Sequence, residues 1–305
     1  MVAAKRREPR PFARADADPR RRDEEGRLHL VVQPDPRGGA PSLALADPVF
    51  DDAWQNDLAL AAASAAHAAL AAAHSREGVA ALGRTIMDAT SKLIDGLLSK
   101  AGDRPVACQS GCAHCCYQAV GVSVPEALAL EAHVRTTRTP EELEALVARV
   151  RATDDRTRGL SSAERLSPEL PCPFLDEGTG RCGVYEARPL ACRGTNSLDA
   201  EACAELLREP AARAAFVAGE RTFPCYLEPL RAFHALSAGL QLALDELHGL
   251  ETKPLELTAA MRILFDDPAR ATEEWLAGRD PFQAARGADS TDNPRIAALS
   301  GRRRT

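Results

Sequence analysis

The chain has 305 residues, nine cysteines and a net charge of −6 at pH 7, and only 4% of its residues are aromatic. This composition argues against a nucleic-acid partner, because a nucleic-acid groove needs basic side chains and stacking rings. No apolar h-region follows the N-terminal arginines, so we expect a cytoplasmic protein with no membrane partner.

Both ends of the chain have the composition of disordered tails. Residues 1–48 mix Arg, Asp, Pro and Gly with few large apolar side chains, and residues 286–305 end near three consecutive arginines. Such segments bury too little apolar surface to offset the entropy of ordering the chain. We therefore predict disorder at 1–48 and 286–305.

An Ala-rich helical segment is predicted at residues 49–103. Its first part, from about 53 to 74, is nearly all alanine, which favours helix but is too weakly apolar for a membrane span. In the second part, apolar residues recur at three- and four-residue spacing from Val79 to Leu97. We expect this stripe to pack on its own domain, with a coiled coil between two subunits as the alternative.

Residues 104–205 carry both helix signals and cysteines. Residues 123–126 and 139–142 each have the Ser/Thr-x-x-Glu spacing of a capping box with a proline in the first turn, and they predict two helices. Residues 152–169 are polar and predict a mobile loop. Two short strands are expected to start at Cys172 and Cys182, joined by a Gly-containing turn that would place these cysteines opposite each other.

The C-terminal part, residues 206–285, returns to helix. Leucines recur from Leu227 to Leu247 and stop before Gly249, while Asp267 and Pro268 predict the start of a last helix through Trp275. Strands do not alternate with helices, which excludes doubly wound and barrel folds. We therefore predict a mainly α fold: a helical domain with a central cysteine-rich segment that contains a short β-hairpin, and C-terminal helices packed on it.

Eight of the nine cysteines form one ordered pattern, which is the strongest signal in the sequence. They are Cys108, Cys112, Cys115, Cys116, Cys172, Cys182, Cys192 and Cys203. A chain without an export signal is not expected to pair so many thiols as disulfides, so metal binding is the simplest interpretation. Eight thiolates make two sets of four, enough for two zinc sites or two iron–sulfur clusters, including the 4Fe–4S form.

The first four cysteines would converge in either of two conformations. A helix over residues 108–116 would place them on one face, whereas a knuckle would use Gly111 to bend the backbone toward the metal. The adjacent Cys115 and Cys116 are expected to point in different directions and to serve two metals or two edges of one cluster.

Other residues near the cysteines have supporting roles in this interpretation. We expect Arg181, Arg188 and Arg193 to screen the anionic thiolates or to donate hydrogen bonds to sulfur. His114 is expected outside the ligand set. Cys225 leaves the count odd, and it is a spare ligand, a reactive thiol or a small buried hydrophobic residue.

Two motifs inside the pattern imitate other sites. The spacing of Cys108, Cys112 and Cys115 also occurs in radical SAM enzymes, but the barrel pattern of that class is missing, so it stays a minor alternative. Residues 178–183 spell a dinucleotide-binding fingerprint, yet they lie in a predicted hairpin and no helix follows them.

In the order and context of its cysteines, the segment from about 104 to 205 resembles the YkgJ-like CxxCxxCC cysteine-cluster family, described as zinc- or iron-chelating. The resemblance implies that the eight cysteines named above are the metal ligands, and that the bound group is an iron–sulfur cluster or zinc. Some relatives are labelled iron–sulfur oxidoreductases and one branch methylates flagellin lysines, so an oxidoreductase or a cluster-dependent methyltransferase is implied. A non-catalytic module stapled by zinc, which docks a protein partner, is the alternative.

Overall fold

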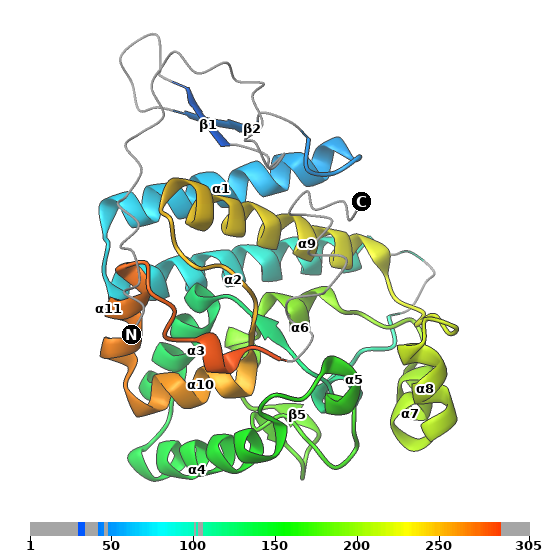
Figure 1. Cartoon of the computed structure of the whole chain (residues 1–305). Helices are drawn as coiled ribbons and strands as arrows, with labels where there is room; N and C mark the ends of the chain where they lie inside the picture. Colours follow the sequence, from blue (N-terminus) through cyan, green and yellow to red (C-terminus); the bar gives the residue numbers. More distant parts are fainter. Residues whose placement is uncertain (1–29, 34–41, 46–47, 101, 103–105, 288–305) are drawn as a thin grey trace.

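The computed structural model describes residues 30–33, 42–45, 48–100, 102 and 106–287. Within these ranges the chain forms eleven α-helices and three two-stranded antiparallel sheets, whose strands are two to four residues long. The helices make up most of the molecule, and the hairpin of β1 and β2 lies at its edge (Figure 1). The predicted mainly α fold is therefore confirmed, including the short hairpin in the cysteine-rich segment.

Most of the two predicted tails lies outside the described residues. Where the N-terminal tail is described, β1 (Leu30–Gln33) pairs antiparallel with β2 (Ser42–Leu45), and Leu30 is buried. At the other end, Arg286 forms an ion pair with Asp280 at 2.6 Å. Within the predicted tails, these few described residues are held in place by an apolar side chain and by an ion pair.

One helical layer consists of α1 (Ala53–Ala72), α2 (Arg76–Leu98) and α9 (Leu227–Leu242). Helix α1 lies along α9, and both contact α2 (Figure 1). The alanines of α1 let these helices approach closely: a Cβ on Gly239 of α9 would lie 1.8 Å from the carbonyl oxygen of Ala59. The Ala-rich helix is thus a packing surface within its own domain, with Ala59, Ala62, Ala63 and Ala66 buried.

A second layer consists of α3 (Val124–Thr137), α4 (Pro140–Thr157) and α10 (Leu257–Asp266), followed by α11 (Pro268–Leu276). Helix α3 packs on α2, and α10 packs on both α3 and α4. Both predicted capping boxes are present, at Ser123 with Glu126 and at Thr139 with Glu142. Local hydrogen bonding therefore fixes where these two helices begin.

The predicted loop at 152–169 is partly helical. Helix α4 continues to Thr157, and α5 (Ser162–Arg165) begins at a third capping box made by Ser161 and Glu164. The polar composition was misleading because an exposed helix face is also polar, and capping stabilises even a single turn.

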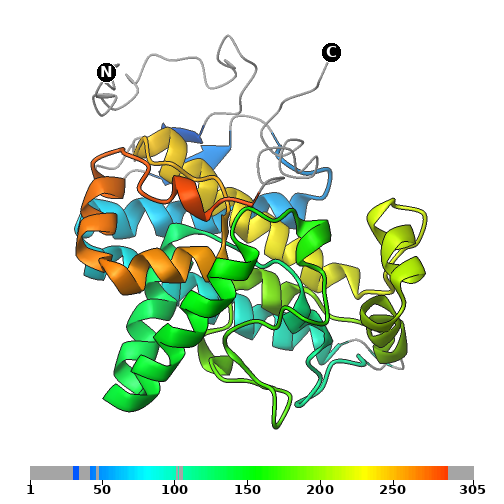
Figure 2. The same ribbon diagram turned by 60° about the horizontal axis from the view of Figure 1, so that its bottom comes forward.

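The cysteine-bearing elements are short and lie at the edge of the helical layers. Turning the molecule brings their loops to the front, while the helix pair α7 and α8 projects to one side (Figure 2). The cysteines within them lie in η1 (His114–Tyr117), β5 (Arg181–Cys182), α6 (Leu190–Gly194) and α7 (Ala200–Arg208). The other short elements of this part of the chain are β3 (Gly121–Val122), β4 (Leu175–Asp176), η2 (Tyr185–Ala187) and α8 (Pro210–Val217).

Three further elements complete the described chain. The π-helical turn η3 (Ala243–Leu247) extends α9, β6 (Leu255–Glu256) pairs with β3, and η4 (Gln283–Ala285) follows α11. Among the helices of the described residues, none combines the length and apolar character needed to cross a membrane.

Candidate metal centre

The first cysteine loop has the knuckle form, not the helical one. Gly111 has a φ of +92°, and the Cys112 N–H donates to the carbonyl oxygen of Gln109 at 3.0 Å. The chain then makes the short 3-10 helix η1, which contains Cys115 and Cys116. A positive φ is accessible to glycine at no steric cost, so Gly111 allows the bend that precedes Cys115 and Cys116.

The hairpin of β4 and β5 packs against this loop, in a register that differs from the prediction. Cys182 lies opposite Leu175, not opposite Cys172, which precedes the strand. Register is set by the tight turn, in which Gly180 N donates to the Asp176 carbonyl at 2.8 Å. A Cβ on Gly180 would lie only 2.5 Å from the carbonyl oxygen of Gly111, so the two turns are in direct contact.

Cys172 and Cys192 are brought to the loop by long-range hydrogen bonds. The Cys172 N–H donates to the carbonyl oxygen of Cys116 at 2.7 Å. Helix α6, which carries Cys192, starts at Leu190, whose N–H donates to Glu126 Oε1 at 2.8 Å. Glu126 also accepts from the Ser123 N–H, so one buried carboxylate joins the start of α3 to the start of α6. Burial raises the pKa of Glu126.

Cys203 and Cys108 meet at the segment before α7. The Cys108 Sγ accepts a hydrogen bond from the Ser197 N–H at 3.2 Å, and the Cys203 thiol donates to the Asp199 carbonyl at 3.3 Å. Cys225 forms a β-bridge with Ser197 through its backbone. Residues 197–199 thus hold both Cys108 and Cys203, and Cys225 lies next to this segment.

We group the eight predicted ligands into two overlapping sets by the thiols that affect one another's pKa, with Cys115 acting on members of both. Burial raises the pKa of Cys108 and of Cys203, and both values are raised further by other cysteines of the same region. For Cys108 these are Cys115 and Cys112, and for Cys203 they are Cys108, Cys112 and Cys115. We call these four the outer set: Cys108, Cys112, Cys115 and Cys203.

The other four cysteines form what we call the inner set: Cys116, Cys172, Cys182 and Cys192. Burial raises the pKa of Cys172 to about 12, and the charge of Cys182 raises it further. Burial also raises the pKa of Cys192, with contributions from Cys115, Cys172 and Cys182. These thiols are protonated at neutral pH, and metal binding would have to displace their protons.

The two sets meet at the adjacent pair Cys115 and Cys116. The Cys116 thiol donates to the Cys115 sulfur, which lowers the pKa of Cys115 to about 6 and raises that of Cys116. Cys115 also raises the pKa of Cys182 and Cys192, so its charge reaches both sets. The two adjacent thiols thus affect each other's ionisation directly, and their service to two metals or to two edges of one cluster stays a prediction.

Arginines surround the inner set. Burial lowers the pKa of Arg188, but the charges of Cys192, Cys115 and Cys182 outweigh this effect and raise it overall. The Arg188 guanidinium donates to the Cys192 carbonyl at 2.7 Å. Arg193 lies 4.5 Å over the Tyr185 ring, and its charge lowers the pKa of Cys182. Two of the three predicted arginines thus lie at the thiols, while Arg181 is exposed.

Arg165 is a further arginine at the thiols that the sequence interpretation missed. Burial lowers its pKa, and the charges of Glu256 and Cys172 oppose that effect. Within the described residues, the buried Nε groups of Arg165 and Arg193 have no hydrogen-bond partner. Unpaired guanidinium donors beside thiols suit an anionic metal–thiolate centre, because each could donate to a charged sulfur.

The donor set fits a soft metal, although the sulfur atoms are not already arranged around one. All nine cysteines are free thiols, and eight of them lie in the two sets. Among the described residues, no three His, Cys, Asp or Glu side chains enclose a point that could hold a metal ion. Thiolates suit zinc and iron–sulfur clusters alike, so the ligand chemistry fits either group, and loading either one would require the sulfurs to draw together.

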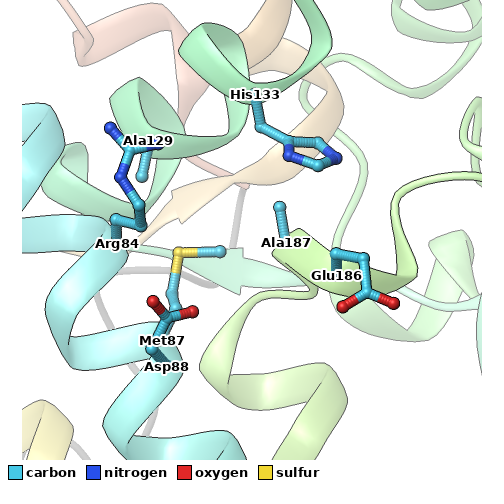
Figure 3. A pocket seen from close by; sticks show the side chains of 7 residues that line it. All are labelled: Arg84, Met87, Asp88, Ala129, His133, Glu186 and Ala187. Carbon is cyan, nitrogen blue, oxygen red and sulfur yellow. The ribbon is translucent and has the colours of Figure 1, made fainter. Parts of the chain in front are cut away.

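A hollow of about 200 Å³ lies beside this region, between α2, α3 and η2 (Figure 3). Buried Met87 and Ala187 face it, and no cysteine lines it. His133 points into the same space, and burial, together with Arg138 and Arg84, lowers its pKa. No sequence pattern indicates this hollow, since its lining comes from three separate segments.

Comparison with known proteins agrees with the cysteine pattern. Residues 107–209 match the sequence model of the CxxCxxCC family, described as a "putative zinc- or iron-chelating domain". The predicted resemblance is therefore confirmed, and the matched segment contains all eight cysteines of the two sets. Helices α1, α2, α9, α10 and α11 lie outside the match. No curated protein and no solved structure matches the chain.

Proposed function

From its CxxCxxCC domain, we propose that this is a cytoplasmic protein that binds an iron–sulfur cluster or zinc through the eight thiols of the inner and outer sets. The observation that carries the proposal is that the eight cysteines of the matched zinc- or iron-chelating domain are gathered around η1, where Cys172 N–H donates to the Cys116 carbonyl and thiols from separate segments raise one another's pKa. Four thiolates are the ligand number of a closed tetrahedral zinc site and of a [2Fe–2S] or [4Fe–4S] cluster. Two adjacent centres, one in each set, account for all eight cysteines.

The contact between Cys115 and Cys116 supports placing the two centres side by side. Neighbouring residues of η1 belong to different sets, and their sulfurs are linked by one hydrogen bond. Loading metal would replace the shared proton, and each sulfur would then bind within its own set. The low pKa of Cys115, about 6, makes it the first thiol to ionise and the natural entry point for a metal.

A bound cluster would supply one-electron transfer, and bound zinc would supply structural stability. The protein's own residues hold the sulfurs, exclude water from the inner set and place Arg188, Arg193 and Arg165 against the negative charge. Arginine donors next to sulfur stabilise the reduced, more negative form of a cluster. We therefore propose electron transfer, as part of an oxidoreductase, for the iron–sulfur form.

A second candidate is a zinc-stapled module that docks a protein partner. The observation that favours it is the lack of buried side chains from residue 106 to residue 119 in the described chain. A loop with so little apolar burial needs another source of stability, and closed zinc sites provide one without an open coordination position.

Anaerobic purification followed by metal and sulfide analysis and an absorption spectrum separates the two candidates. A brown protein with sulfur-to-iron charge-transfer bands at about 400 nm would support the cluster and exclude zinc. A colourless protein with stoichiometric zinc from an iron-replete preparation would exclude the cluster. A protein with neither metal would contradict both.

A further inference from the structure

Two histidines on the opposite side of the fold from the family match face each other. His67 of α1 and His248, which follows η3, are 3.3 Å apart between Nδ1 and Nε2. Their rings are tilted by 44° with centroids 5.3 Å apart. We infer that this pair is a second metal site, for a divalent transition ion such as Ni²⁺ or Zn²⁺, independent of the cysteines.

The separation of the two nitrogens is the first argument. It is at the long limit for a hydrogen bond, since N–H donors usually lie about 2.7–3.2 Å from their acceptors. Two nitrogens that each lie about 2.0–2.1 Å from a tetrahedral ion are about 3.3–3.4 Å apart. The pair therefore already has the spacing of two imidazole ligands of one ion.

The backbone conformation of the residues around His248 also supports a site. Residues 243–247 form a π-helical turn, and Gly249 has a φ of +63°. Single π-helical turns are rare, and they occur frequently at functional sites. Gly249 is an ordinary helix end, whereas the π-helical turn is the unusual feature, and it places His248 where its ring faces His67 of α1.

The surroundings suit a cation held by two protein ligands. Both histidines are half-buried, and η3 places acidic Asp245 and Glu246 just before His248. His74, two residues after α1 ends, is exposed, and its Nε2 lies 3.3 Å from the Leu276 carbonyl oxygen. Because no three such side chains already enclose an ion in the described residues, water would complete the coordination.

Binding needs no change in net protonation. In the free pair, one facing nitrogen carries the shared proton; moving that proton to the outer nitrogen of its ring leaves two lone pairs directed at the ion. Imidazole nitrogen suits zinc, nickel and copper ions, whereas thiolates favour zinc and iron–sulfur clusters. Cysteine sets that already hold their metal should therefore not take up nickel readily, which makes nickel a suitable probe for the histidine pair.

The test uses the full chain with its cysteine sets loaded with the metal found on purification. Ni²⁺ is added in small excess, free ion is removed by gel filtration, and bound nickel is measured. We expect one Ni²⁺ per chain, and His67→Ala and His248→Ala to bind it at least about ten-fold more weakly. His133→Ala is the matched control, a half-buried histidine away from the pair, and should bind as the parent does.

Alanine at position 67 suits the Ala-rich helix α1, so this variant should fold. If either variant unfolds, the test uses ¹⁵N spectra of the histidine rings in the parent protein instead. Nickel should then broaden the signals of His67 and His248 before those of His114 and His133. No nickel above the cysteine-bound metal, or equal binding by parent and variants, would overturn the inference.

Discussion

The helical layers and the cysteine-bearing segments of this protein are stabilised in different ways. In the layers, α1, α2 and α9 bury long runs of alanine, leucine and isoleucine, and Leu128 of α3 is completely buried. From residue 106 to 119, by contrast, no described residue is buried, and the contacts are single hydrogen bonds such as Cys172 N–H to Cys116 O. Apolar burial therefore folds the layers and also anchors the later cysteine segments through Phe174, Leu175 and Leu190, while the first cysteine loop depends on what its sulfurs bind.

The largest expected effect is the loss of a ligand from the inner set. We expect Cys172→Ser to lose metal and hydrogen-exchange protection across the cysteine segments, because structural metal binding is worth on the order of 10 kcal/mol. Exchange measured by mass spectrometry should show α1, α2 and α9 still protected.

Cys225→Ser is the matched control, since its bridge to Ser197 uses only the backbone. A large metal loss in this variant would make Cys225 a ligand. If Cys172→Ser kept full metal content and normal protection, the ligand assignment would be wrong.

A cavity in the helical layers should have the opposite effect, lowering stability without removing metal. Leu128→Ala should lower the free energy of unfolding by about 2–5 kcal/mol, the usual cost of removing a fully buried leucine side chain. Metal content at 25 °C should not change. Leu227→Ala, at a side chain that is 51% exposed, is the control and should be nearly neutral. Metal loss in Leu128→Ala below its unfolding temperature would contradict the separation of the two regions.

Glu126 connects the two regions, so its replacement should affect both. The buried Glu126 carboxylate accepts from the N–H groups of Ser123 and Leu190, and Glu126→Gln places an amide N–H₂ against one of these donors. This change should lower the free energy of unfolding by about 1–3 kcal/mol. Chelator should also remove metal faster, because α6 carries Cys192. Glu142→Gln makes the same substitution in the exposed capping box at the start of α4, where the amide oxygen can still accept from Thr139, and it should leave metal release unchanged. Equal release rates in both variants would show that Glu126 acts only within α3.

The smallest effect is expected from the arginines. Arg188→Gln removes a guanidinium that donates to the Cys192 carbonyl and lies close to the charges of Cys115 and Cys182. Metal affinity, measured by competition with a chelator, should fall about ten-fold. Exposed Arg181→Gln should have no measurable effect. If the two variants behave alike, Arg188 does not stabilise the thiolates.

Local chemistry made part of the fold predictable. The capping boxes at Ser123 and Thr139 were found from sequence because a helix start is set by hydrogen bonds between residues three apart. The hairpin was also found, but its register was not: Cys172 lies four residues before the turn that starts at Asp176, whereas Cys182 lies two residues after Gly180, so Cys182 pairs with Leu175.

Contacts between distant segments could not be predicted in this way. The bond between Glu126 and Leu190 joins residues 64 positions apart, and the sequence pattern of Glu126 is already explained by its capping box. The eight cysteines were named from their spacing, but their division into two sets depends on how α6, α7 and the hairpin pack around η1. The pair of His67 and His248 likewise exists only in the folded chain.

Cysteine alkylation before and after metal removal tests the central claim most directly. Protein purified anaerobically is treated with an alkylating reagent, digested and mapped by mass spectrometry, then compared with protein first stripped by a chelator. The account predicts that the eight cysteines of the inner and outer sets are protected together and become reactive only after stripping, while Cys225 reacts equally in both samples. Unchanged reactivity of the eight cysteines after stripping would contradict it.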